Sequence, residues 1–495
     1  MLAERGLDLT YETVRRWVTK FGPLFARELR RRRPRPTSRW HMDEMAITIA
    51  GKRYWLWRAV DDEGEVLDIL VQSRRDTRAA VRLMRKLIRK VIMNFEVNRR
   101  GLLKGAGALA GMSALPLVSP VFAAQGPAAI LGIVPLTGPY AADGERIKRG
   151  QEMAVEDFRA AHKGVDVKYV FRDSAGDAGT ATRRVSEAIE SEKIIAIAGP
   201  WADDVAAAVD DIAKREKRVH FWSGGPLPCH RYYFNWAPPY YAGVNATMRY
   251  VAEKNPKAKR WYMLTSDYSF GWTLEDYEKR VAKDLGIEFV GSTKHVLGER
   301  EFSPYMGDIA AAKPDVIVLN NFGLDTAQAL RAASSFGLTQ SAQILVPWGS
   351  GIEDYLRLDP SITSGVVIGS AFYYTIDNPV AQSFSKRYLE RFGEPPGYPA
   401  GSGYAAMALL LEGVSKADKP EAASLVRALE GWEGETVVGK TRIDRDTHQT
   451  FHSFFVTEGK KPGDVKDKFD LASIVKTVDG SAPADVLGCP KIGDL

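Results

Sequence analysis

Residues 129–161, AILGIVPLTGPYAADGERIKRGQEMAVEDFRAA, place a short apolar run just before a stretch with helical periodicity. Residues 129–134 are almost wholly apolar, which is typical of a strand in a parallel sheet with both faces covered. Over residues 149–161 the apolar side chains recur every three or four positions, which is the period of an amphipathic helix. The stretch therefore predicts a strand, a loop and a helix, the first unit of an α/β domain.

The same alternation continues toward the C-terminus. We expect strands at residues 129–134, 165–171, 194–198, 219–222, 261–265, 316–320, 344–347 and 366–371, and helices at residues 149–161, 178–191, 203–215, 241–254, 274–285, 302–311 and 326–336. Strands that alternate with helices form βαβ units and mainly parallel sheets. About 370 residues exceed one comfortable hydrophobic core, so two α/β lobes are expected. An Ala/Leu-rich helix at residues 404–414 is too short to span a membrane and should pack in the first lobe.

Three stretches carry a resemblance to a known family. GIVPLTGPYAADGERIKRGQEMAVEDF (132–158), FRDSAGDAGTATRRVSEAI (171–189) and SDYSFGWTLEDYEKRVAKDLGIEFVG (266–291) resemble the branched-chain-amino-acid type of periplasmic substrate-binding protein, the solute receptors of ABC importers. The resemblance covers nearly all of residues 128–460. It implies the periplasmic-binding-protein type I fold, in which two doubly wound Rossmann-like lobes joined by a hinge close over a small solute.

The resemblance also implies domain limits, partners and a location. The binding part should cover residues 125–495, with a first lobe at about 125–238 plus 373–440 and a second lobe at about 239–372 plus 441–495. A small-molecule ligand and an ABC permease are the expected partners, the periplasm is the expected location, and neither a cofactor nor catalysis is implied. Beyond residue 124 the sequence shows no Ser-His-Asp spacing and no phosphate loop. His448 and His452 could hold zinc if they share a face, but surface histidines without a metal are the simpler interpretation.

Carried over residue by residue, the resemblance places the ligand at the carboxyl ends of strands. The first lobe should contribute the loops at residues 137–143, 199–203 and 223–225, and the second lobe should contribute aromatic side chains that cover the ligand. The expected ligand-binding residues are Thr137, Asp143, Trp201, Asp203, Ser223, Gly224, Gly225, Phe270, Phe322 and Trp348. Backbone N–H groups near a helix start, together with the Ser223 hydroxyl, are suited to hold a carboxylate or a carbonyl oxygen.

Trp348, in VPWGSG, departs from the family pattern. Amino-acid-binding members place an acidic residue shortly after this strand, where it pairs with the ammonium of the ligand. A buried ammonium without a counter-charge is costly, so the sequence favours a carboxylic acid, an amide or an aromatic compound. Asp143 or Asp203 could replace the missing acid. Some of the aromatic residues could instead belong to the core, and for Trp222 the two interpretations are equally open.

Residues 98–124, NRRGLLKGAGALAGMSALPLVSPVFAA, have the layout of a secretory signal peptide. RRGLLK at residues 99–104 resembles the twin-arginine export signal. The apolar run is short for a membrane span, which needs roughly 20 residues, and its glycine spacing does not match a dinucleotide loop. We expect a signal peptide at residues 93–124 that uses the export machinery and is cleaved near Ala124. In an oxidising compartment Cys229 and Cys489 could then form a disulfide, the alternative being two buried thiols.

Residues 1–92 differ from the rest in charge. They contain 22 Lys or Arg and 12 Asp or Glu, a net charge of +10, which leaves −4 for the remainder of a chain whose formal total is +6. The sequence predicts a short helix at residues 10–21, a basic linker at residues 27–39, strands within WHMDEMAITI, KRYWLWRAVD and EVLDILVQS, and a helix at residues 76–90.

This N-terminal segment resembles a DDE transposase of a bacterial insertion sequence. The resemblance implies a partial ribonuclease-H-like fold over residues 1–92, in which Asp43 matches the first catalytic carboxylate. Two-metal phosphoryl transfer requires several carboxylates, and the later ones have no counterpart before the export signal. We therefore expect no transposase activity, and contact with nucleic acid only if the fragment folds.

Two other functions and two origins stay open at this point. The alternative function from another class is a transposase-derived DNA-binding protein, and a weaker one is a sensory receptor with the same fold. The joint near residue 93 could record an insertion element truncated against a receptor gene, or a translation start at Met93.

Overall fold

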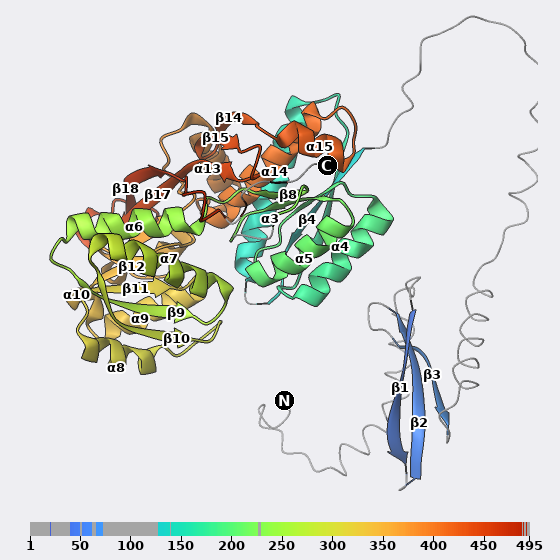
Figure 1. Cartoon of the computed structure of the whole chain (residues 1–495), viewed down its shortest axis with the longest axis horizontal. Helices are drawn as coiled ribbons and strands as arrows, with labels where there is room; N and C mark the ends of the chain where they lie inside the picture. Colours follow the sequence, from blue (N-terminus) through green and yellow to red (C-terminus); the bar gives the residue numbers. More distant parts are fainter. Residues whose placement is uncertain are drawn as a thin grey trace, which may run out of the picture. The chain divides into compact units, whose positions relative to one another are not determined.

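The computed structural model describes residue 20 and residues 40–49, 52–61, 66–72, 127–138, 140–225, 229–487, 489 and 492. The chain forms two compact units, residues 1–119 and residues 120–495 (Figure 1). Apart from Lys20, which is helical, the helix expected at residues 10–21 lies outside the described residues. So do the basic linker, the helix expected at residues 76–90 and the export signal.

The first unit contains a three-stranded antiparallel sheet in the order β1-β2-β3. Its strands are β1 (Trp40–Ile49), β2 (Lys52–Asp61) and β3 (Val66–Gln72), which confirms the three strands predicted from sequence. The strands are rich in the aromatic and β-branched residues that favour a pleated sheet. Asp43 lies within β1 and pairs in register with Arg58 of β2.

The second unit begins with a parallel sheet that forms the base of the first lobe. Its strand order is β5-β4-β6-β7-β8. The strands are β4 (Ala128–Val134), β5 (Val167–Asp173), β6 (Ala196–Ala198), β7 (Val219–Trp222) and β8 (Tyr233–Asn235). The helices of this lobe are α3 (Ala141–Ala161), α4 (Ala178–Glu192), α5 (Asp203–Arg215), α14 (Tyr398–Lys416) and α15 (Ala422–Leu429). Every residue of β4 is buried, as its apolar sequence predicts.

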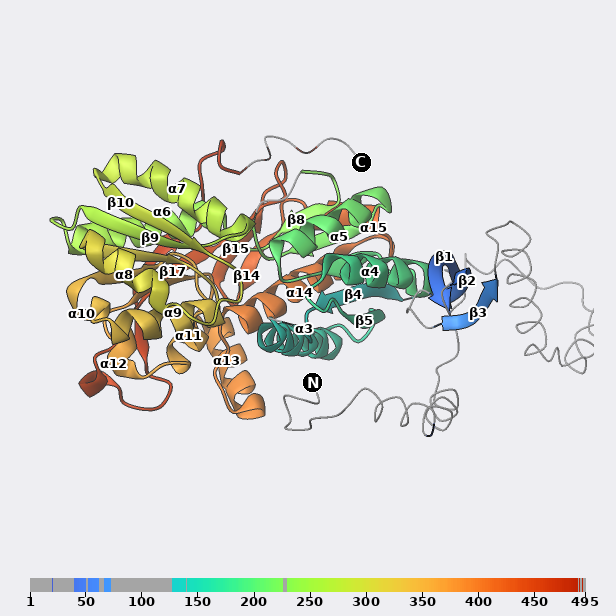
Figure 2. The ribbon, with the colours of Figure 1, turned by 90° about the horizontal axis from the view of Figure 1, so that it is seen from below.

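Helix α14 packs along α3, although more than 200 residues separate them in the sequence (Figure 2). Glycines make the close approach possible. A Cβ atom on Gly150 would lie 2.2 Å from the carbonyl oxygen of Ala400, and one on Gly403 would lie 2.4 Å from that of Ile147. The predicted placement of the Ala/Leu-rich helix in the first lobe is therefore confirmed.

The second lobe is built on a seven-stranded sheet with the order β10-β9-β11-β12-β13-β17-β18. Its strands are β9 (Arg260–Ser266), β10 (Glu288–His295), β11 (Val316–Asn320), β12 (Gln343–Val346), β13 (Val367–Ser370), β17 (Ser453–Gly459) and β18 (Ala472–Asp479). The first five strands in this order are parallel, whereas β17 and β18 pair antiparallel. The sequence did not predict β10, because this edge strand is half exposed and largely polar.

Helices α6 (Tyr240–Lys254), α7 (Ser269–Leu285), α8 (Ser303–Ala312) and α9 (Leu324–Ser335) surround the second sheet. The shorter helices are α10 (Leu338–Ser341), α11 (Ile352–Leu356) and α12 (Pro360–Thr363). Among the described residues, no helix is both long and apolar enough to cross a bilayer. Two doubly wound α/β lobes were expected, and this fold class is confirmed.

The chain passes between the two sheets after β8, after β13 and after β16. The segments around the last two passages are α13 (Pro379–Phe392) and a small sheet of β14 (Glu433–Thr436), β15 (Gly439–Ile443) and β16 (Thr450–Phe451). An isolated parallel bridge joins Asn235 to Gln449 where the first and third passages meet. A disulfide links Cys229 to Cys489, with their Cα atoms 5.5 Å apart, and it ties the last residues to the body of the unit.

His448 and His452 lie in this hinge region and are buried, so their assignment as surface histidines was wrong. The His448 ring contacts the Tyr233 carbonyl oxygen at 2.9 Å and the Glu430 carboxylate at 3.0 Å. The His452 ring contacts the Trp236 carbonyl at 3.1 Å, and burial lowers the pKa of His452 to about 4. Every nitrogen of the two rings faces a protein oxygen. The arrangement therefore leaves no ring nitrogen for zinc.

Candidate ligand-binding cavity between the lobes

A cavity lies between the two lobes of the second unit. Its empty volume is about 380 Å³, with the solvent at its mouth included. The first lobe contributes Tyr140, Trp201, Ala202, Asp203, Ser223, Gly224 and Tyr398, and the second lobe contributes Tyr240, Tyr268, Phe270, Phe322 and Trp348. Small-molecule sites occur preferentially where two domains meet, and this cavity lies at such a place.

The lining residues sit where a doubly wound sheet places its ligand. In the first lobe β5 and β6 lie on opposite sides of β4, and in the second lobe β10 and β11 flank β9 in the same way. The strand order reverses at β4 and at β9, and the crevice beyond such a reversal is the usual ligand site. Tyr140 and Trp201 follow the reversal in the first lobe, and Tyr268 and Phe322 follow it in the second.

Six aromatic side chains form a closed ring of contacts around the cavity. The ring centroids are separated by 5.7 Å for Trp201–Phe322, 6.0 Å for Phe322–Phe270, 5.2 Å for Phe270–Tyr240, 4.8 Å for Tyr240–Trp348, 6.0 Å for Trp348–Tyr398 and 5.4 Å for Tyr398–Trp201. Both lobes contribute to the ring, because Trp201 of the first lobe meets Phe322 of the second. Inclined pairs of this kind are favourable beyond the area they bury, so the ring helps to hold the lobes together.

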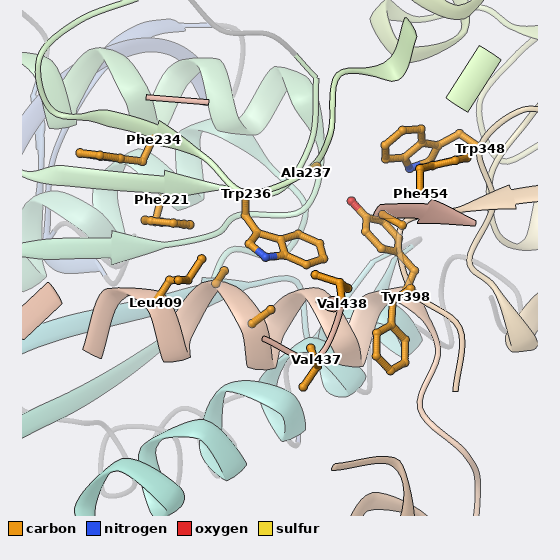
Figure 3. Close-up of a cluster of buried hydrophobic side chains, with 14 of the residues drawn as sticks. Phe221, Phe234, Trp236, Ala237, Trp348, Tyr398, Leu409, Val437, Val438 and Phe454 are labelled. Atoms are coloured by element: carbon orange, nitrogen blue, oxygen red, sulfur yellow. The ribbon is translucent and has the colours of Figure 1, made fainter. Parts of the chain in front are cut away.

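The cavity wall continues directly into the hydrophobic core. Trp348 packs on Phe454 with ring centroids 4.9 Å apart, and Tyr398 packs on Trp236 at 6.3 Å (Figure 3). Since Trp348, Trp236 and Phe454 are fully buried, these rings have little freedom to move. The inner wall of the cavity is therefore shaped before any ligand arrives.

Asp203 is the charged residue of the lining and begins helix α5. Its Oδ1 atom accepts hydrogen bonds from the backbone N–H of Gly225 and from the Tyr240 hydroxyl, both at 3.3 Å. Burial raises the pKa of Asp203 to about 6, because the effect of burial is larger than that of the two hydrogen bonds, which lower the pKa. At neutral pH the cavity therefore carries a negative charge that is held in a fixed orientation.

Seven of the ten expected residues line the cavity, and three do not. Thr137 is exposed, and its hydroxyl donates to the Asp173 carboxylate at 3.1 Å. Gly225 lies behind the wall, where its N–H is engaged by Asp203 rather than free for a ligand oxygen. Asp143 is buried outside the cavity in a cluster of charged side chains.

That cluster joins the two lobes. Asp143 and Arg146 belong to α3 of the first lobe, whereas Glu353 and Arg357 belong to the second lobe. Asp143 lies 3.5 Å from Arg357, and Arg146 lies 3.5 Å from Glu353. Burial raises the pKa of Asp143 and raises the pKa of Glu353 to about 8. Each arginine therefore faces an acid across the gap, but burial disfavours the charged form of both acids, so the cluster marks where the lobes meet rather than a strong ion pair.

Five lining residues were not predicted from the sequence, namely Ala202, Tyr140, Tyr240, Tyr268 and Tyr398. Tyr140 lies inside the loop that was expected to border the cleft, and Tyr268 precedes Phe270 by two positions, so both had a signal nearby. Tyr398 begins α14, far along the chain, and no quoted motif covers it. Trp222, whose role was open, belongs to the core, where it is fully buried and its indole N–H donates to the Gly225 carbonyl at 2.9 Å.

Comparisons with known proteins agree with this fold. The periplasmic binding protein family model matches residues 127–464. The Leu/Ile/Val-binding protein homolog 4 of Brucella melitensis is 22% identical over 374 residues, which cover 72% of this chain and 89% of that protein. The amino acid ABC transporter substrate-binding protein from Pseudomonas fluorescens has a similar structure, with a TM-score of 0.70 and 29% identity, over 74% of this chain and 99% of the other.

The N-terminal unit has a separate similarity. A DDE domain model matches residues 37–109, which overlaps the first part of the stretch assigned to the export signal. The transposase of the insertion sequence-like element IS431mec from Staphylococcus aureus is 34% identical over 90 residues, 18% of this chain and 40% of that transposase. The similarity therefore spans less than half of a transposase. Since the binding protein model matches more than half of this chain, the chain belongs to the periplasmic binding protein family.

Proposed function

We propose that this chain captures a small organic ligand in the cavity between its lobes and delivers it to an ABC permease from the periplasm. Amino acids, amides and carboxylic or aromatic acids are the ligand classes to which the family resemblance points. The proposal rests chiefly on one observation, namely that twelve residues from both lobes line a single small cavity. A ligand that contacts both walls favours the closed arrangement, and a permease can recognise that arrangement.

The residues divide the work of binding between them. The ring of six aromatic side chains supplies apolar surface and excludes water. Trp201 and Phe322 contribute to this surface from opposite lobes. Asp203, Ser223 and the tyrosine hydroxyls supply the polar contacts that fix the orientation of a ligand. No step of this function breaks or forms a covalent bond, so we propose a receptor rather than an enzyme.

A panel of ligands tests the receptor function on the full chain. Leucine, valine, benzamide, 4-hydroxybenzoate, choline and 2-phenylethylamine are added separately, and the melting temperature is recorded. A ligand present at one hundred times its dissociation constant stabilises a protein by about 2.7 kcal/mol, which corresponds to several degrees. We expect one chemical class to raise the melting temperature. If no member of any class does so, the receptor proposal is wrong.

We further propose that residues 93–124 direct export and that the working receptor begins near Ala124. The support is the Arg99-Arg100 pair, the apolar run and the small residues that end it. N-terminal sequencing of the exported protein tests this proposal. A first residue near Ala124 or Gln125 is expected, whereas an exported chain that retains residues 1–92 would contradict it.

A further inference from the structure

The charge of the cavity wall differs from that expected for an acid-binding site. Of the twelve lining residues, all of them in the described part of the chain, eight are aromatic and one is charged, and that one is Asp203. No lysine, arginine or histidine is among these twelve. Arg146 and Arg357 lie outside the cavity and face the side chains of Glu353 and Asp143 in the cluster that joins the lobes.

One backbone donor that was expected to hold a carboxylate is already engaged. The Gly225 N–H donates to Asp203 at 3.3 Å. Helix α5 begins with Asp203, which lines the cavity. Its negative charge offsets the attraction that a helix start normally exerts on an anion.

The second carboxylate oxygen of Asp203, Oδ2, has a different role open to it. Both of the hydrogen bonds to its carboxylate fall on Oδ1, and within the described residues Oδ2 accepts none. Oδ1 is fixed by Gly225 and Tyr240, so the carboxylate can present Oδ2 to a ligand without losing its support. A charged donor such as an ammonium is the partner that a carboxylate oxygen binds most strongly.

The ring of six aromatic side chains also favours a cationic ligand. Five of its six successive ring pairs are inclined at 64° or more, so most neighbours meet edge to face rather than in parallel stacks. The face of an aromatic ring is electronegative and attracts a cation within about 6 Å of its centroid, and cages of such rings recognise alkylated ammonium groups. The same faces repel a carboxylate.

We infer that the cavity selects a small organic cation, which is an alkylated or protonated amine. Asp203 is its counter-charge, and the ring of six aromatic side chains is its cage. This inference rests on the receptor function proposed above and names its ligand class. Amino-acid-binding members of the family have an acidic residue after the strand that corresponds to β12, where this chain has Trp348. Asp203 would replace that acid, and Trp348 belongs to the cage. A carboxylic acid is one of the ligand classes that the sequence favoured, and it would be repelled by the negative charge of Asp203.

Matched ligands that differ in charge test the inference on the full chain by calorimetry at pH 8. Choline is compared with 3,3-dimethylbutan-1-ol, its uncharged isostere, and 2-phenylethylamine is compared with 2-phenylethanol and phenylacetate. We expect at least one of the two cations to bind at least tenfold more tightly than its uncharged partner, and phenylacetate to bind more weakly still. If the uncharged or the acidic partner binds as tightly as the cation, the inference fails.

Two variants separate the role of Asp203 from a general change in the fold. Asp203→Asn keeps an oxygen for Gly225 and Tyr240 but removes the charge, so it should weaken cation binding by about 10- to 100-fold and leave the uncharged isosteres unaffected. Asp204→Asn, one position further on and exposed, should change neither. Equal losses for charged and uncharged ligands would overturn the inference.

The outcomes also distinguish this inference from the receptor function. Binding of leucine or 4-hydroxybenzoate, without binding of either cation, would overturn the cation inference and leave the receptor proposal intact. Failure of every class to bind would overturn both.

Discussion

Replacing Asp203 by asparagine should stabilise the empty receptor at neutral and alkaline pH. Burial raises the pKa of this carboxyl from 3.8 to about 6, which means that the folded protein holds the charged form at a cost. Each pKa unit corresponds to about 1.36 kcal/mol, so the cost reaches about 3 kcal/mol at most, and solvent at the mouth reduces it to about 1–3 kcal/mol. Asparagine removes the charge and retains both hydrogen bonds to Oδ1.

The pH dependence gives the prediction its sign. Between about pH 4 and pH 6 the folded protein binds more protons at this site than the unfolded chain, so its contribution to the free energy of unfolding falls as the pH rises. Above pH 6 the cost is fully present, and below pH 4 it vanishes. The variant should therefore exceed the wild type by about 1–3 kcal/mol at pH 8, and the two should converge near pH 4.

Urea unfolding of the full chain, followed by tryptophan fluorescence at several pH values, measures this difference. The exposed Asp204→Asn serves as the matched control and should follow the wild type. If Asp203→Asn is less stable than the wild type at pH 8, or if its advantage does not change with pH, the reasoning from burial of the charge is wrong.

Three further predictions concern other parts of the chain. Burial raises the pKa of Glu278 to about 8, so between pH 6 and pH 9 this group should lower the free energy of unfolding by about 3 kcal/mol, and Glu278→Gln should abolish that part of the slope in urea titrations. Cys489→Ser should lower the stability by about 2–5 kcal/mol, since the disulfide to Cys229 closes a loop of 260 residues; a reduced wild type should match the variant in thermal melting, and an unchanged melting temperature would contradict this role. Replacing Arg99 and Arg100 by lysine should retain the precursor in the cytoplasm, measured by cell fractionation, and undiminished export would argue against the twin-arginine proposal.

Local patterns carried most of the fold. Strands such as β4 and β11 are apolar throughout and fully buried, so their sequences identify them directly. The edge strand β10 is half exposed and lacks this pattern. Strands β17 and β18 return to the second sheet after the chain has passed through the first lobe, and no local signal records that return.

The site was only partly accessible from the sequence. Trp201 and Phe322 stand directly after strands, where the family resemblance and the sheet rules both place a ligand. The charge of the cavity depends on which side chains line it, and Asp203 and Gly225 come together only once two loops meet. The sequence showed the donors near the helix start but not that an acid engages one of them. The sequence likewise did not show that Asp143 pairs with Arg357 of the other lobe instead of contacting a ligand.

The central claim is that the cavity between the lobes holds the ligand, and a calorimetric titration of the full chain beside its Ala202→Phe variant tests it most directly. Ala202 lines the cavity with an extended backbone conformation that phenylalanine also adopts, and it packs against the core of the first lobe. The larger side chain should narrow the cavity, and a melting temperature equal to that of the wild type shows that the variant is folded. The titrant is the member of the ligand panel that raises the melting temperature most, and the account predicts one bound molecule per wild-type chain and none per variant chain. Binding that persists unchanged in the variant, or a wild-type chain that binds no member of the panel, would contradict it.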